Sequence, residues 1–512
     1  MGARNSLAYS KSEVVTAPDL KVGRWGYVLA GLIGFYFALQ NLQIRTGDDA
    51  GIFVSISALV ARGARLYVDV YETKEPLFYW LYGLAFMAGG IKGIAVAEFL
   101  LVVACAILCF RLLSVLAGSF LWAALTTVLF TGSLTGSFYA PIITSVPGLF
   151  TVMVVLNLLL KQRPLFYGAA IVFVCFSKLA FLPIVLGPTA VILIYESKFL
   201  RRVFEASIGA ILALLSIISL LAVRGELFGY VEMVRDQARY KDVYPEVVGL
   251  PKGLAAPVQL LQSAMGLSVY LLLLLVQGLF LIRLGKANMM LRVQLFFLSI
   301  QIGAVGSIFL TGFWFHHLLP LSVLILGFAG FVAVELHKQT DISDSTKEFI
   351  DRTLSNVLAM GLCVVVAIGS GWDLSVHPRS NFAQELISEV EPPPSYKSLN
   401  QMSIGSQVGV RFSRLGPNDE LGLAAFLPAT WQLSCRFYGG QYGHESAEQE
   451  RETIDCLTDN PEVLFISSGF FSLTRPAGDY DSFRAKLIEV VDRNFDCIDV
   501  PARAGSQICT RR

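Results

Sequence analysis

Two adjacent carboxylates, Asp48 and Asp49, follow directly on the first long apolar run of the chain. A pair of charges at the end of a membrane helix is costly to desolvate, which favours a chemical role, although a solvated loop also tolerates such a pair. A carboxylate placed there can accept the proton of an attacking hydroxyl group. Asp48 is the candidate general base by position, and Asp49 is the alternate base or a contact to a metal ion or an acceptor.

Two lysines at the ends of apolar segments are candidates for binding an anion. Lys74 immediately precedes the second apolar segment, and Lys178 stands where a longer run has to turn. An ammonium group is a compact charge that suits a phosphate at the headgroup level, whereas a lysine at a membrane boundary also serves as a snorkelling anchor. Arg235 and Arg239 fit one helical face toward the same anion, unless that face is simply solvated.

Aromatic, acidic and histidine side chains near these boundaries are candidates for contacting a polar ligand. His316 and His317 adjoin in an aromatic setting, where belt residues are also common. Adjacent histidines lack the i, i+4 spacing of a helical zinc pair, so a divalent metal shared with Glu72 or Glu75 is the weaker alternative. The candidate contacts are Tyr71, Glu72, Glu75, Tyr240, Trp314, His316 and His317.

The composition places all these residues in a membrane protein. Of the 512 residues 54% are hydrophobic and only 15% are charged, whereas about 25% are charged in an ordinary soluble domain. The 40 basic residues balance 39 acidic ones. Because there is no basic excess, nucleic acid is excluded as the expected partner.

The first apolar run, residues 25–44, is too long and too late for a cleaved signal and is expected to remain as a span. Basic residues in segment 1–24 place the amino terminus in the cytoplasm by the positive-inside rule. The loop 45–76 is then extracytoplasmic, as is a second polar loop at 224–266.

Further apolar segments predict an all-α membrane domain over residues 25–372 with about 13 transmembrane helices. Segment 165–195 lies between basic turns, so it goes out and back with its turn near Lys178. Segment 115–160 requires three crossings, or two and a re-entrant piece. The segments are 77–92, 94–113, 115–160, 165–195, 203–223, 267–283, 292–311, 313–334 and 353–372.

The polar residues 373–512 are predicted to form a small extracytoplasmic α/β domain. A strand-like stretch at 462–468 precedes a helical pattern at 482–495. Four cysteines in this part favour one or two disulfides, and four others in apolar runs are expected to be small buried side chains. The first set is Cys435, Cys456, Cys497 and Cys509, and the second is Cys105, Cys109, Cys175 and Cys363.

The stretch 45–80 resembles the GT-C superfamily of integral-membrane glycosyltransferases. The likeness lies in an acidic pair after the first span, a short helix at 50–63, and Lys74 with Pro76 opening the next segment. It is greatest to the branch with the lipid A aminoarabinose transferase and the rhizobial galacturonosyl transferases. Lys178 resembles a family lysine at the end of a short mid-chain span. Asp49 and segment 144–147 depart from the family, which often has Glu and an outer Asp there.

The resemblance implies an inverting transferase in the bacterial cytoplasmic membrane. Such an enzyme takes a sugar from a polyprenyl-phosphate donor and places it on a glycolipid or polysaccharide outside. Asp48 or Asp49 would then be the base, while Lys74 and Lys178 would bind the carrier phosphate. A transporter or lipid flippase is the competing class, since it also carries charges at membrane boundaries. A non-catalytic scaffold that displays the C-terminal part is the third.

Overall fold

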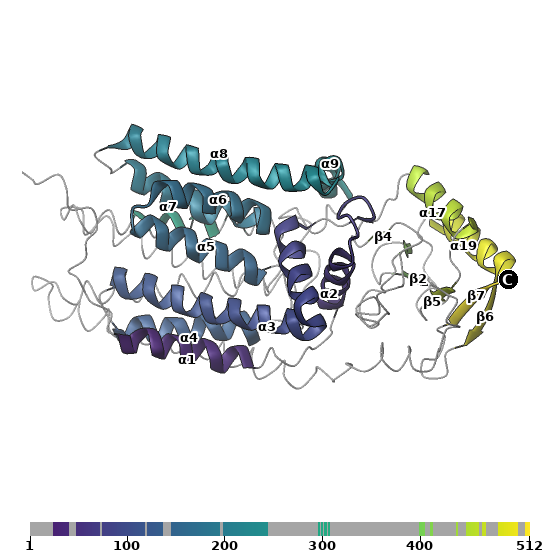
Figure 1. Cartoon of the computed structure of the whole chain (residues 1–512), viewed down its shortest axis with the longest axis horizontal. Helices are drawn as coiled ribbons and strands as arrows, with labels where there is room; N and C mark the ends of the chain where they lie inside the picture. The colour runs from purple at the N-terminus through teal and green to yellow at the C-terminus, as the bar shows by residue number, and fades with distance from the viewer. Residues whose placement is uncertain are drawn as a thin grey trace, which may run out of the picture.

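The computed structural model describes the helices of the first half of the chain and the sheet of its C-terminal part (Figure 1). The expected spans 267–283, 313–334 and 353–372 lie outside the described residues. The described residues are 24–39, 48–71, 74–117, 120–136, 145–194, 198–243, 295–296, 298–300, 302–304, 306–307, 399–404, 410–412, 437–438, 447–459, 463–466, 480–499 and 507–512.

The apolar runs form helices, as expected for a chain whose backbone polar groups must bond internally within lipid. Among the described residues, three helical stretches are long and apolar enough to cross a membrane, namely Pro76–Val115, Pro164–Ile194 and Phe199–Val223, so the chain is a membrane protein. The elements are α1 (Arg24–Leu39), α2 (Asp48–Ala61), β1 (Val70–Tyr71), α3 (Pro76–Ala117), α4 (Phe120–Gly136), α5 (Ser145–Leu160), α6 (Pro164–Lys178), a 3-10 turn (Leu179–Phe181), α7 (Leu182–Ile194), α8 (Phe199–Val223) and α9 (Leu227–Val243).

Helix α3 is bent, and its first part does not continue along the long helices. The bend falls at Gly89 and Gly90, where Gly90 has a φ of 59°, a backbone conformation that favours glycine. Figure 1 shows the first part of α3 lying with α2 across one end of the long helices. The sequence predicted two segments, 77–92 and 94–113, and the non-helical backbone at Gly89 and Gly90 divides α3 into two helices near that boundary.

Segment 115–160 holds α4 and α5, and only residues 137–144 lie between them. Eight helical residues rise about 12 Å, less than half the thickness of the hydrocarbon layer. The two helices α4 and α5 therefore fit the predicted alternative of two crossings and a re-entrant piece better than three full crossings. The extra crossing was needed only because the first part of α3 was counted as a span.

Contacts between helices fix their directions. The Arg202 guanidinium at the start of α8 donates to the Gln162 carbonyl just before α6, at 3.1 Å. Farther along, Gly168 of α6 meets Ala206 of α8, so these two helices run parallel. Because α7 joins them, the chain returns along α7, and the break at Lys178 falls where the sequence predicted it. We call the end where α6 and α8 finish the site end.

The C-terminal part is a mixed sheet with helices, which confirms the predicted α/β character. The sheet order is β3-β2-β5-β7-β6, with β2 and β5 parallel and the other pairs antiparallel. Its elements are β2 (Leu399–Ile404), β3 (Val410–Phe412), β4 (Phe437–Tyr438), α17 (Ala447–Asp459), β5 (Val463–Ile466), α19 (Tyr480–Asn494), β6 (Phe495–Asp499) and β7 (Gln507–Arg511). The buried side chains that join helices to sheet are Leu457, Leu487, Val491, Phe495 and Cys509.

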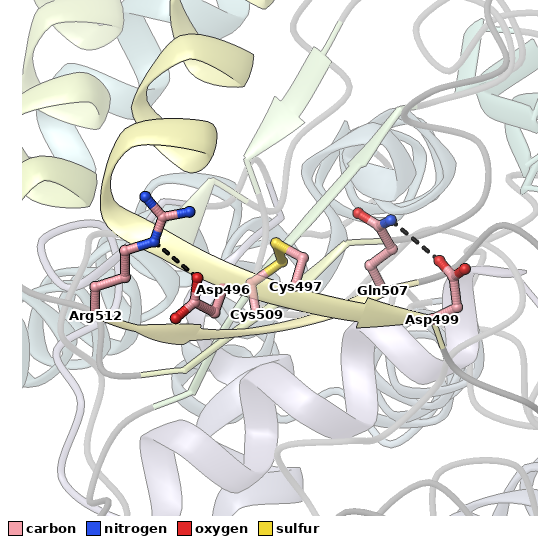
Figure 2. The surroundings of a disulfide bond; sticks show 6 residues. All are labelled: Asp496, Cys497, Asp499, Gln507, Cys509 and Arg512. Carbon is pink, nitrogen blue, oxygen red and sulfur yellow. Dashed lines mark hydrogen bonds and ion pairs between the residues drawn. A yellow bond between two sulfur atoms is a disulfide. The ribbon is translucent and has the colours of Figure 1, made fainter.

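A disulfide joins the last two strands. Cys497 of β6 and Cys509 of β7 are cross-strand partners and are bonded (Figure 2). Two polar contacts flank the bond along the same hairpin, from Arg512 to Asp496 at 2.7 Å and from Gln507 to Asp499 at 3.1 Å. Cys456 is also disulfide-bonded. The prediction of disulfides in this part is confirmed, and Cys105, Cys109 and Cys175 are free.

The C-terminal part meets the loop after α2 through a strand pair. β1 pairs in parallel with β4, with Val70 opposite Phe437 and Tyr71 opposite Tyr438. Backbone pairing requires both segments to lie on the same side of the bundle. The contact therefore brings a segment from the last quarter of the chain to the site end.

Candidate functional site

Glu226 ties three elements together at the site end. Its side chain is fully buried between α8 and α9. The carboxylate accepts hydrogen bonds from the Leu66 backbone N–H at 2.9 Å and from Trp80 Nε1 at 3.1 Å, and it pairs with Arg224 Nε at 2.8 Å. Because a buried carboxylate needs such partners, it fixes the loop after α2, the first part of α3 and the corner before α9 relative to one another.

Helix α2 packs against the first part of α3 through an apolar face. The Phe53 and Phe78 rings meet edge to face at 5.2 Å, and a Cβ on Gly83 would lie 3.2 Å from Val60. Asp48 and Asp49 form the first turn of α2, two residues before the helix predicted at 50–63. The positive end of the helix dipole at this turn favours the ionised form of a carboxyl group.

Tyr67 positions the backbone of Lys74. The Tyr67 ring is fully buried, with its centroid 5.4 Å from that of Tyr230 on α9. Its hydroxyl donates to the Lys74 carbonyl at 2.8 Å. The loop that holds Tyr67 is closed by the Arg65–Asp69 ion pair at 2.8 Å. The position of Lys74 therefore depends on contacts from both the loop and α9.

Lys178 ends α6 with its side chain inside the protein. Only 6% of the residue is exposed, and its ammonium group donates to the Ser145 hydroxyl at 2.7 Å. The same group lies 5.1 Å from the centre of the Phe181 ring. Gly148 of α5 leaves room for this arrangement, since a Cβ there would lie 2.9 Å from the Lys178 Cβ. The start of α5 thus holds a buried cation at the site end.

Glu75 brings the two predicted lysines together. Its carboxylate accepts the Leu179 backbone N–H at 2.8 Å, which ties the start of α3 to the turn after α6. Burial raises the pKa of the Glu75 carboxyl above its ordinary value, and the Leu179 N–H and the charges of Lys178 and Lys74 oppose that rise. Lys74 and Lys178, 104 positions apart in the chain, therefore act on one carboxyl group.

Tyr230 closes the α9 side of this cluster. Its ring stacks on Phe176 of α6, with centroids 5.6 Å apart and planes at 30°. Burial raises the pKa of the Tyr230 hydroxyl well above its ordinary value, and the nearby Glu75 and Cys175 add to the rise. The hydroxyl thus keeps its proton beside the carboxyl, so it can act as a hydrogen-bond donor there. We call Lys74, Glu75, Ser145, Lys178 and Tyr230 the Glu75 cluster.

None of the other predicted site residues has a described side chain in the Glu75 cluster. Arg235 lies on α9 and is exposed, and Arg239 and Tyr240 follow on the same helix. Tyr71 lies in β1, beside the C-terminal strand β4. The side chains of Asp48 and Asp49 and the whole of Glu72, Trp314, His316 and His317 lie outside what the structure describes.

No group of three or more His, Cys, Asp or Glu side chains able to hold a metal ion occurs among the described residues. The predicted metal alternative depended on Glu72 or Glu75 with the histidine pair, and of these only Glu75 is described. Glu75 is held instead by a backbone N–H and by lysine charges.

Ser145, Tyr67, Tyr230 and Glu226 belong to the site end but were not predicted as site residues. Ser145 stands at the first turn of α5, a place where serine usually caps the helix. Glu226 could have been found from the sequence. An acidic side chain between an apolar span and a helix needs either solvent or hydrogen-bond donors around its carboxylate. The Ser145 hydroxyl is identified as part of the site only by its distance to the Lys178 ammonium group.

No family model matches this chain, and no curated protein matches it either.

Proposed function

We propose that the chain is an integral-membrane glycosyltransferase of GT-C type in a bacterial cytoplasmic membrane. It transfers a sugar from a polyprenyl-phosphate carrier to a glycolipid or polysaccharide on the outer face. The observation that supports this proposal is the 2.8 Å hydrogen bond from the Leu179 N–H to Glu75, which joins the residue after Lys178 to the residue after Lys74 at the site end. There α2, which begins with Asp48 and Asp49, lies across the long helices (Figure 1).

The reaction needs one proton acceptor and stabilisation of one leaving phosphate. The acceptor oxygen bonds to the anomeric carbon while the bond from that carbon to the phosphate oxygen breaks, and the phosphate leaves with the electron pair. Asp48 or Asp49 takes the acceptor proton. The departing phosphate gains one negative charge, which Lys74 and Lys178 stabilise electrostatically. A single displacement of this kind inverts the anomeric configuration.

The test begins with a mass spectrum of surface glycolipids from cells with and without the protein, which should differ by one sugar unit. The variants Asp48→Asn and Asp49→Asn should then identify the base in a vesicle assay. Loss of a general base lowers the rate by a factor of about 10² to 10⁴. Glu232→Gln, at an exposed acid on α9, is the control. An unchanged glycolipid profile, or full transfer by both variants, would contradict the proposal.

A transporter or lipid flippase is the second candidate, and one buried carboxyl favours it. Glu98 lies fully buried within the membrane-spanning part of α3, where ionisable residues often mark a transport path. Its carboxyl accepts a hydrogen bond from Tyr82, on the other side of the bend in the same helix. Carrier movement between leaflets of reconstituted vesicles, without sugar transfer and abolished by Glu98→Gln, would favour this class.

A further inference from the structure

Glu75 has a position that the proposed reaction does not use. Its carboxylate sits on the N–H of Leu179, the first residue of the turn that follows Lys178. Lys178 itself has an extended backbone, with φ −163° and ψ 92°, so the chain changes direction between the lysine and this N–H. An anion bound to the Leu179 N–H therefore lies between the end of α6 and the turn that follows it.

The groups around Glu75 are those that a phosphate would require. The Leu179 N–H donates a hydrogen bond, Lys178 and Lys74 supply positive charge, and the Ser145 hydroxyl lies 2.7 Å from the Lys178 ammonium group. Backbone N–H groups and buried cations are common ligands of phosphate oxygens. A carboxylate of the protein, that of Glu75, occupies one of these donors.

Burial and the neighbouring donors act in opposite directions on the charged form of Glu75. Burial raises the pKa of Glu75 although two lysines and a backbone N–H favour its charged form. A second anion at the same donors would add repulsion to that burial. The two negative charges would therefore compete for one set of donors.

We propose that Glu75 is a resident anion of the carrier-phosphate site, and that the phosphodiester of the carrier replaces it at the Leu179 N–H and beside Lys178. This inference rests on the proposed function for the identity of the ligand. The phosphate ligands are then Lys178, Lys74, the Leu179 N–H and the Ser145 hydroxyl. Glu75 keeps the lysines and the turn in place until the carrier arrives.

If the carrier phosphate replaces Glu75, carrier binding must weaken as the pH rises. A phosphodiester carries one fixed negative charge, so its arrival raises the pKa of Glu75 further and the carboxyl takes up a proton. Binding that takes up one proton weakens as pH rises, by at most about tenfold per pH unit. The other titratable groups facing Glu75 are Lys74, Lys178, Tyr230 and Cys175. Their types have reference pKa values of about 8.5 or higher.

The test measures binding of farnesyl methyl phosphate to the full-length protein in detergent by isothermal titration calorimetry, between about pH 5 and about pH 8. The wild-type Kd should rise with pH by up to about tenfold per unit, with proton uptake in buffers of different ionisation enthalpy. Glu75→Gln keeps a carbonyl oxygen for the Leu179 N–H but has no charge, so it should bind about tenfold more tightly near pH 7.5 without proton uptake. Glu232→Gln, at an exposed acid on α9, should behave as wild type.

Three results would overturn this inference, and a fourth would overturn the proposed function alone. A wild-type Kd that does not change with pH overturns the inference without any variant. Weaker binding by Glu75→Gln at every pH also overturns it, because the carboxylate would then only position the lysines. Equal binding of dimethyl phosphate, which has the charge but no tail, would overturn the assignment to a lipid carrier. If pH-dependent binding occurs without sugar transfer, this inference stands and the proposed function fails.

Discussion

The cation at the site end depends on one small residue that has no chemical group of its own. Gly148 of α5 faces Lys178, and an added Cβ would lie 2.9 Å from the Lys178 Cβ and 3.0 Å from the Phe181 ring. Neither contact can be kept, because carbon atoms at this distance overlap. The lysine side chain must then move away from the Ser145 hydroxyl, although its charge is unchanged.

Gly148→Ala should therefore weaken carrier binding and transfer without removing any ligand. A shift of about 1 Å in a positioning group can cost about 10² in rate. Transfer in vesicles and the Kd for farnesyl methyl phosphate measure the effect. Gly31→Ala on α1, where the nearest atom is 4.0 Å away, is the matched glycine control. Normal binding by Gly148→Ala would show that the position of Lys178 is not critical.

At the level of elements, the layer that lies across the bundle end is held by Glu226. Removal of its carboxylate leaves the Leu66 N–H and the Trp80 indole N–H buried without an acceptor, and leaves Arg224 without its ion-pair partner. Because Arg224 is 31% exposed, water can solvate its charge. The two buried donors left without an acceptor cost about 1 to 3 kcal/mol each, or about 2 to 6 kcal/mol together. Glu226→Ala should lower the free energy of unfolding by about this amount, measured by thermal unfolding in detergent.

Glu205→Ala is the control for this change, since Glu205 forms a surface ion pair with Arg201 on α8. Such pairs contribute about 0.5 kcal/mol or less. Hydrogen exchange should show faster opening of the loop after α2 in Glu226→Ala alone. Equal losses in the two variants would show that Glu226 does not join the elements.

Hydropathy predicted the elements better than their directions. It identified the apolar runs and the break at Lys178, because a basic turn on each side of segment 165–195 requires an even number of passes. It could not identify the first part of α3 as a helix that lies across the bundle end, since such a helix is as apolar as a span. The bend needs Gly90 at a positive φ, but the sequence holds many glycines in similar apolar surroundings.

The lysines of the site were predictable because a charge next to an apolar run is unusual. The Leu179 N–H and the Ser145 hydroxyl were not, because they become ligands only when the start of α5 and the end of α6 meet. Glu75 was predicted as a substrate contact. Its hydrogen bond to the Leu179 N–H joins two segments that are distant in the sequence, and residue spacing could not predict this contact. Long-range partners of this kind depend on tertiary packing.

At the level of the whole molecule, the parallel course of α6 and α8 separates two sets of loops. The α5–α6 turn at Lys161 lies at one end, and α9 with the Glu75 cluster lies at the other. The strand pair between β1 and β4 adds the C-terminal part to the second set. If the helices cross a bilayer, these two sets of loops face opposite aqueous compartments.

Single cysteines at Lys161 and Glu232 test this arrangement, since both residues are exposed. Cys105 and Cys109 are buried, so they should give little background with a membrane-impermeant maleimide, whereas Cys175 is partly exposed and is replaced by alanine in both variants. The positive-inside rule places the basic turn at Lys161 in the cytoplasm. Glu232→Cys should then react in intact spheroplasts, while Lys161→Cys should react only after the membrane is permeabilised. Reaction of both in intact spheroplasts would contradict the crossing of α6 and α8, and the reverse pattern would place the Glu75 cluster on the cytoplasmic side, where an outer acceptor could not reach it.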